Sequence, residues 1–200
     1  MMRSLRSRAA LRSLAAMVVA VTGVLGATAC GGTTPISPGV SGSRATLYSN
    51  LSLLVADSST VVAGEAVSSV PRNDDDGLPT TYVTIRVGEV FDPATLGDNL
   101  PPELLEAAAK ADVREGAEVF VKQYGSADSP GEFPPLELND RYLLFLVPTL
   151  QDGDDPATFY VVGASAGIYA ADGTAFTRAY PQSGDTLPAE LTTADLRRAG

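Results

Sequence analysis

The sequence predicts a mainly β domain, a small barrel or sandwich of about six strands with one inserted helix. Two observations predict this class. Short runs of apolar and β-branched residues recur from residue 60 to residue 177, and glycine, proline, asparagine or aspartate separates them. In this part of the chain only residues 101–112 have the alanine-rich composition of a stable helix.

The first elements are a short helix and two strands. Residues 51–55 place leucine and valine at helical spacing, and Ser49 before them is a candidate N-cap; a strand is the alternative for this stretch. The β-branched run 60–70 predicts a strand that ends at Pro71. Residues 82–87 alternate between apolar and polar side chains, so we expect a strand with one buried face.

The middle of the chain holds the inserted helix and the most apolar strand. Residues 101–112 begin with two prolines and continue with alanines, and Gly116 is a candidate terminator of this helix. Residues 118–124 again have the pattern of a strand. Residues 141–147 are apolar on both faces, which predicts the central buried strand.

The last third predicts three strands and a helix. Residues 158–162 form one strand, and residues 168–171 and 174–177 form a hairpin. Its arms are joined by Asp172-Gly173, a pair that favours a two-residue turn. Residues 192–198 predict a short final helix, capped by its first threonine.

The first 29 residues have the layout of a secretory signal peptide. Their basic head holds four arginines and no acid, and the apolar run 14–26 follows it. A membrane-spanning helix needs roughly 20 apolar residues, and two glycines interrupt this shorter run. We therefore expect a cleaved leader over residues 1–29, with a permanent span as the alternative.

The residues that follow the apolar run resemble the lipobox of bacterial lipoproteins of the Gram-positive, actinobacterial type. Residues 27–30 read Ala-Thr-Ala-Cys, and Cys30 is the only cysteine of the chain. The family prefers leucine where this chain has Ala27. The resemblance implies that Cys30 receives a diacylglycerol and becomes the first residue after cleavage. A secreted protein that is cut after Ala29 and carries no lipid is the alternative.

Lipidation would attach the protein to the outer face of the cytoplasmic membrane without a membrane span. Residues 30–44 are rich in glycine, serine, threonine and proline, so we expect a flexible tether there. The folded domain would then occupy residues 45–200.

The domain itself resembles, loosely, secreted Gram-positive domains with an OB-like barrel. The residues that carry the resemblance are 57–67, the strand that begins at Tyr82, and 141–146. They are patterns of apolar strand with glycine. The resemblance implies an OB-like fold and carries no activity with it.

Composition excludes several classes of function. Without the four arginines of the leader, the chain has ten basic and 24 acidic residues, a formal charge of −14. Nucleic-acid binding is disfavoured, because it relies on lysine and arginine at phosphates. There is no histidine, so imidazole catalysis is excluded. One cysteine excludes an internal disulfide and a multi-thiolate zinc site.

Residues 163–167 read Gly-Ala-Ser-Ala-Gly, which matches the nucleophile elbow of serine hydrolases. The elbow needs a helix after Ser165, where we predict a hairpin, and it needs a base. Lys110 and Lys122 are the formal candidates for that base, but both occupy positions expected to be solvated. We therefore expect no catalysis at Ser165.

Two acidic clusters, residues 74–76 and 152–155, are candidates for calcium binding, but neither has a known ligand spacing. Solvated turns are the favoured interpretation, and no metal or cofactor is expected. Tyr82, Tyr124 and Tyr180 are candidates for an exposed surface that stacks on sugars or binds protein, although positions at the rim of the core are favoured.

Together these observations predict a membrane-anchored extracytoplasmic lipoprotein, a non-enzymatic binding or structural module of the cell envelope. Its partner would be an envelope protein or a cell-wall component. An envelope hydrolase that uses carboxylates or Ser165, and a module that binds calcium weakly, remain the alternatives.

Overall fold

The computed structural model describes residues 46–74, 77–126, 128, 131, 135–181 and 184–199. The chain divides into two units, residues 1–35 and 36–200, and every described residue belongs to the second. The predicted leader, the tether, Cys30, Asp75 and Asp76 therefore lie outside the described residues.

The mainly β class is confirmed. Eight strands form one mixed sheet, and three short helices accompany them. The strands are β1 (Thr60–Asn73), β2 (Pro79–Phe91), β3 (Glu118–Tyr124), β4 (Arg141–Pro148), β5 (Thr158–Val161), β6 (Ile168–Asp172), β7 (Ala175–Arg178) and β8 (Glu190–Leu191). The helices are α1 (Leu51–Ala56), α2 (Pro102–Lys110) and α3 (Thr193–Arg198).

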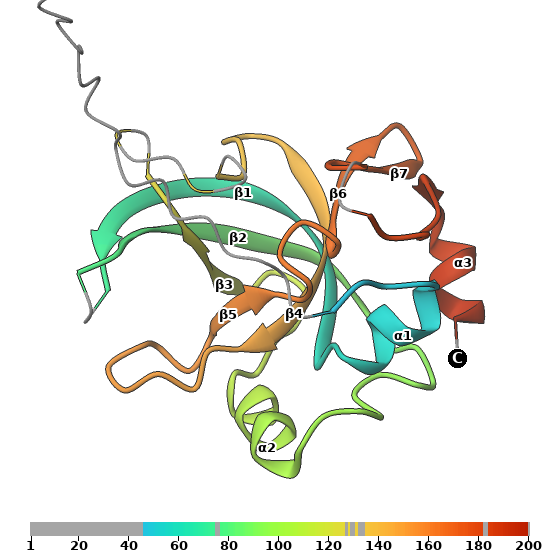
Figure 1. Cartoon of the computed structure of the whole chain (residues 1–200), viewed down its shortest axis with the longest axis horizontal. Coiled ribbons are helices and arrows are strands. Elements are labelled where there is room, and N and C mark those ends of the chain that lie inside the picture. Colours follow the sequence, from blue (N-terminus) through green and yellow to red (C-terminus); the bar gives the residue numbers. More distant parts are fainter. Residues whose placement is uncertain are drawn as a thin grey trace, which may run out of the picture. The chain divides into compact units, whose positions relative to one another are not determined.

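Five strands form a barrel-like ring, in the order β1-β2-β3-β5-β4, that closes where β4 pairs with β1. The pairing of β3 with β5 is parallel, and the other four pairings are antiparallel. Strands β6, β7 and β8 continue the sheet from β4 away from the ring (Figure 1).

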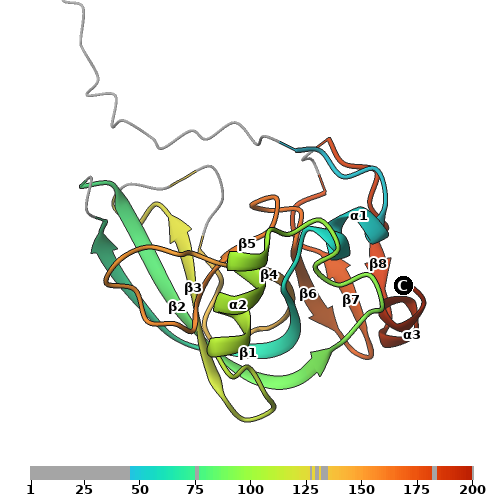
Figure 2. The same cartoon turned by 90° about the horizontal axis from the view of Figure 1, so that it is seen from below.

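The helices lie outside the ring. Helix α2 is inserted between β2 and β3 in the chain, as the sequence predicts, and Figure 2 shows it in front of the strands of the ring. Helices α1 and α3 lie at the other end of the domain, near β7 and β8. In the described part of the chain, no helix is long and apolar enough to cross a membrane.

Strands β1 and β4 separate two hydrophobic cores. Leu144 and Leu146 of β4 point into the ring, where all five of its strands contribute side chains. Leu143 and Phe145 point to the other side, into a core shared with α1, α3 and β6 to β8. This arrangement confirms the central buried strand and explains why β4 is apolar on both faces.

Strand β1 bends as it leaves β4. It pairs with β4 only through Thr60–Glu65 but follows β2 to its end. A register shift lies beside Gly64, where β2 has Gly88 as an extra residue. A Cβ atom on Gly64 would lie 2.6 Å from the carbonyl oxygen of Arg86. Only glycine permits this approach of the two strands.

Several predicted boundaries are wrong. The cap of α1 is Asn50 and not Ser49, because Asn50 Oδ1 accepts the Leu53 N–H at 2.9 Å. Strand β1 continues through Pro71 to Asn73, because there β2 is its only strand partner among the described residues, so β1 lies at an edge of the sheet.

Two further boundaries shift at turns. Helix α2 ends at Lys110, six residues before Gly116, and Gly116 instead turns the chain into β3 with φ +79°. In the β6–β7 hairpin, Asp172 already pairs with Ala175, so the turn consists of Gly173 and Thr174. Gly173 supplies the positive φ, +62°, that such a turn requires. The two-residue strand β8 was not predicted.

Gly64→Ala should lower the free energy of unfolding by about 2 kcal/mol, because the added methyl group meets backbone that cannot move without breaking the ladder. Denaturant unfolding of the purified variant measures the change. Gly88→Ala is the matched control, because its Cβ would meet its nearest atom at 3.4 Å. Equal effects of the two substitutions would contradict the packing explanation.

Candidate binding face

Side chains on the outer side of β1, β2, β3 and β5 form a candidate binding surface. Val83 and Val121 point into the ring, so their neighbours Tyr82 and Lys122 point outward. Val70, Tyr82 and Lys122 lie opposite one another in one cross-strand row. Arg72, Thr80 and Tyr124 form the next row, and Tyr160 of β5 completes the surface. We call Val70, Arg72, Tyr82, Tyr124 and Tyr160 the tyrosine face.

Tyr124 and Tyr160 stack on each other across the seam between β3 and β5. Their ring centroids are 6.0 Å apart, their planes differ by 16°, and their hydroxyl oxygens are 3.3 Å apart. Strands β3 and β5 pair through only two positions, ending at Val121 and Phe159. The tyrosine pair therefore extends the contact of the two strands beyond their ladder. Tyr124 remains 42% exposed.

Tyr82 lies between basic side chains. The guanidinium carbon of Arg72 is 4.7 Å from its ring centroid, and the Lys122 Nζ atom is 5.3 Å from it. Cations at this distance are attracted to the ring. The Tyr82 hydroxyl donates a hydrogen bond of 2.9 Å to Asp154 Oδ1.

Lys122 binds the loop that joins β4 to β5. We call this loop, residues 149–157, the β4–β5 loop. The Lys122 ammonium group donates a hydrogen bond to Gln151 and forms an ion pair of 3.7 Å with Asp154 Oδ2. The expectation that Lys122 is solvated is wrong, because this loop covers it and leaves its side chain 3% exposed. Lys110, by contrast, is exposed on α2 as predicted.

The environment of the cluster keeps the lysine charged and the tyrosines neutral. Burial lowers the pKa of Lys122, but its hydrogen bond with Tyr82 and the charge of Asp154 raise that pKa by more. Burial raises the pKa of Tyr82 and of Tyr160. At neutral pH the two phenols are therefore protonated, and Lys122 is in its charged form.

Ser165 does not lie at an accessible nucleophile position. It is fully buried in the turn that carries the chain from β5 to β6, and strand β6 follows it in place of a helix. The glycines serve this turn: Gly163 has φ +61°, and a Cβ on Gly167 would lie 2.8 Å from the Val162 carbonyl oxygen. The backbone of Phe145 in β4 forms hydrogen bonds with both sides of the turn: its N–H donates to the Gly167 carbonyl, and its carbonyl accepts the Val162 N–H.

The acidic residues have other partners. Asp154 contacts Tyr82 and Lys122, and the Asp155 carboxylate accepts the Ala157 N–H at 2.8 Å. Asp74 accepts the Leu78 N–H in the β1–β2 turn. No group of three Asp, Glu or Cys side chains comes together as a metal site within the described ranges.

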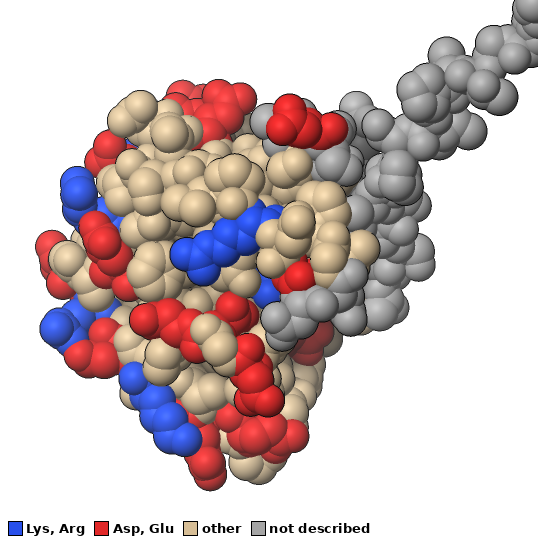
Figure 3. Space-filling view, turned by 90° about the vertical axis from the view of Figure 1, so that its left-hand side faces the viewer, with Lys and Arg blue, Asp and Glu red and all other residues tan. Residues whose placement is uncertain are grey.

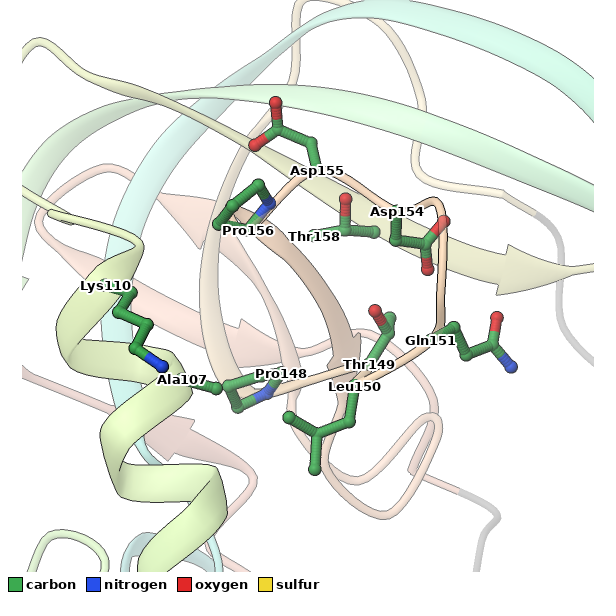
Figure 4. A pocket seen from close by; sticks show the side chains of 10 residues that line it. All are labelled: Ala107, Lys110, Pro148, Thr149, Leu150, Gln151, Asp154, Asp155, Pro156 and Thr158. Atoms are coloured by element: carbon green, nitrogen blue, oxygen red, sulfur yellow. The ribbon is translucent and has the colours of Figure 1, made fainter.

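A small cavity of about 110 Å³ lies behind the β4–β5 loop, between that loop and α2 (Figure 4). Lys110 reaches it from α2, and Asp154 and Thr158 face it from the other side. The cavity is too small for a sugar or a nucleotide, whose sites usually measure ~300 Å³ or more.

The surface near the tyrosine face has mixed charge. Figure 3 shows the side that carries the β1–β2 hairpin and the β4–β5 loop: uncharged side chains fill much of its upper half, acidic side chains lie above and below them, and basic side chains lie at the centre and along the left edge. Of the three tyrosines considered from sequence, Tyr82 and Tyr124 belong to the tyrosine face. Tyr180 is half-buried and packs against the ring core, as the favoured interpretation predicts.

No known protein family matches this chain, and no curated protein shows significant similarity to it.

Asp154→Ala should lower the free energy of unfolding by about 3 kcal/mol, because it leaves the buried ammonium of Lys122 without its counter-ion. Asp152→Ala is the control, because Asp152 is an exposed acid in the same loop and its loss should change stability by less than about 0.5 kcal/mol. Denaturant unfolding of both variants provides the comparison. A cost for Asp154→Ala no larger than for Asp152→Ala would show that Lys122 needs no ion pair.

The free energy of unfolding should fall as the pH rises from about 10 to about 12. Burial raises the pKa of Tyr169 to about 12, and the unfolded tyrosine ionises near pH 10. Above pH 10 the unfolded state therefore binds fewer protons than the folded state, and folding loses stability. Denaturant titrations at intervals of pH measure this loss. Tyr169→Phe should reduce it, and unchanged stability up to pH 12 would contradict the burial of Tyr169.

Proposed function

We propose that this chain is a lipid-anchored, extracytoplasmic binding module of the bacterial cell envelope. The observation that carries the proposal is the order of features at residues 1–30. A basic head, an apolar run, small residues and the only cysteine of the chain follow one another as in a lipoprotein precursor. Two acyl chains on Cys30 would hold the mature protein firmly at the membrane surface.

The way the domain begins supports the proposal. The first described residues form hydrogen bonds with a distant part of the chain. The Tyr48 N–H donates to Asp185 Oδ1 at 2.8 Å, and the Tyr48 carbonyl accepts the Thr186 N–H at 3.0 Å. Asp185 is itself held by a buried ion pair of 2.5 Å with Arg178. A tether that enters at residue 45 would therefore join a well-anchored point of the fold.

The tether sets the distance between the domain and the membrane. For the 15 residues 30–44, a flexible chain has a mean end-to-end distance of about 20 Å. That length leaves the domain free to turn its surfaces toward the surrounding envelope. A net charge of −14 also keeps it from lying flat on an anionic membrane.

Binding, and not catalysis, is the role we propose for the domain. Ser165 is buried, Lys122 is held in its charged form, and the chain contains no histidine. The tyrosine face, in contrast, carries aromatic rings and hydrogen-bonding groups on the outer side of the sheet. Tyrosine is enriched at binding interfaces, because its ring is apolar and its hydroxyl is polar.

Expression in a bacterial host that processes lipoproteins tests the anchor. The protein should partition with membranes, resist extraction by high salt and incorporate a fatty-acid analogue. Cys30→Ser should abolish the lipid label, because it removes the thiol that accepts the diacylglycerol. Salt resistance matters because electrostatic attraction cannot hold so acidic a domain at an anionic membrane.

The matched control for this experiment is Thr28→Ser, which keeps a small residue in the lipobox and should leave the labelling unchanged. Lipid labelling that persists in Cys30→Ser would contradict the proposal. So would wild-type protein that salt removes from membranes.

A further inference from the structure

We propose that the β4–β5 loop is a lid that opens while the rest of the domain stays folded, and that its opening uncovers Lys122. The inference goes beyond the proposed function, because it concerns how the charge of the tyrosine face is regulated. Three features carry it: the loop contacts the sheet through few side chains, its backbone is strained at Leu150, and a cavity separates it from α2.

Few contacts hold the loop to the sheet. Lys122 donates a hydrogen bond to Gln151 and forms an ion pair with Asp154, and the Tyr82 hydroxyl donates to Asp154. In the described part of the chain, the backbone hydrogen bonds of residues 150–156 are local and join groups between residues 151 and 158. Except for Asp154, all residues from 150 to 156 are exposed. A segment with so few buried contacts opens at a smaller free-energy cost than global unfolding.

Leu150 strains the closed loop. Its φ is +52°, in the left-handed region, where its Cβ approaches the backbone too closely. Gly153 in the same loop also has a positive φ, +86°, but has no Cβ and adopts it without strain. Both neighbours of Leu150 are bound: the Thr149 N–H donates to the backbone of β5 at 3.1 Å, and Gln151 accepts from Lys122. Release of Gln151 would let Leu150 return to an ordinary φ, so the strain favours opening.

The loop is loosely supported on the side of α2. The cavity of about 110 Å³ lies between the two, and Leu150 is among its lining residues (Figure 4). None of the residues of α2 is buried, so the helix itself packs loosely. Atoms that line a void lack contacts on that side, which weakens the closed arrangement.

Opening changes the charge that the tyrosine face presents. In the closed loop the Lys122 side chain is 3% exposed, and Arg72 is the accessible cation of the face as defined above. The two cationic groups lie on the same ring, since Arg72 and Lys122 are 4.7 and 5.3 Å from the centroid of Tyr82. When the loop moves away, Asp154 leaves with it and Lys122 becomes accessible beside Arg72. The open face would therefore attract anionic groups more strongly than the closed face.

The chain has two lysines, which make the opening measurable. Lys110 is exposed and Lys122 is covered, so an amine-acetylating reagent at low concentration should modify Lys110 directly and Lys122 only while the loop is open. Peptide mass spectrometry of full-length protein, purified in detergent from host membranes, gives both rates. We expect Lys122 to react about tenfold or more slowly than Lys110. It should still react about tenfold or more faster than the free energy of global unfolding allows, which denaturant unfolding measures separately.

Variants identify the contacts that close the loop. Gln151→Ala should raise the rate of Lys122 relative to Lys110 by about tenfold, because it removes a hydrogen bond to the ammonium group. Leu150→Gly should lower this ratio by about fivefold, because glycine adopts a positive φ without strain. Asp152→Ala is the matched control, since Asp152 is exposed in the same loop, and should leave the ratio unchanged. Thermal unfolding verifies that each variant is folded.

Three outcomes would overturn the proposal. A Lys122 rate that matches global unfolding would show that the loop does not open by itself, and a rate equal to that of Lys110 would show that the loop does not cover Lys122. A ratio that Gln151→Ala or Leu150→Gly leaves unchanged would show that these residues do not control the loop. None of these outcomes affects the lipid anchor, which the Cys30→Ser labelling tests separately.

Discussion

The pairing of β1 with β4 is the constraint on which the rest of the structure depends. These two strands close the ring, and β4 and the first part of β1, where the two pair, are buried on both faces. Val62 and Leu144 face the ring interior, while Val61 and Phe145 face the second core. Because the two cores share one wall, neither can form in its native arrangement unless β1 and β4 pair in this register. A slip of one residue would exchange the side chains of the two cores.

The candidate site depends indirectly on the pairing of β1 with β4. Closure of the ring places β1, β2, β3 and β5 next to one another in this order, and their outward side chains then form the tyrosine face. The β4–β5 loop leaves the end of β4 and folds back over this surface, where Lys122 holds it. A buried lysine with a single carboxylate partner adds little net stability by itself. Its effect here is positional, since it fixes where Gln151 and Asp154 lie beside the aromatic rings.

Local patterns were sufficient to predict the class and most elements. Strand β4 could be recognised because double burial leaves a continuous apolar run, and α2 because alanines follow prolines. What depends on distant partners could not be recognised. The burial of Lys122 comes from a loop more than 25 residues away in the chain. Tyr160 belongs to the tyrosine face only because β5 pairs with β3. The sequence of β5 contains no pattern that predicts this pairing. The signature around Ser165 matches a hydrolase motif for a different reason, a crowded turn against Phe145.

The lipid anchor proposed at Cys30 decides where this β domain works, because it would hold the domain at the membrane surface. Intact-mass spectrometry of protein extracted from host membranes tests it most directly. We predict a mass equal to residues 30–200 plus a diacylglycerol group on the first residue, with or without a further acyl chain. A mature protein that begins at another residue, or one that carries no lipid mass, would contradict the lipid anchor.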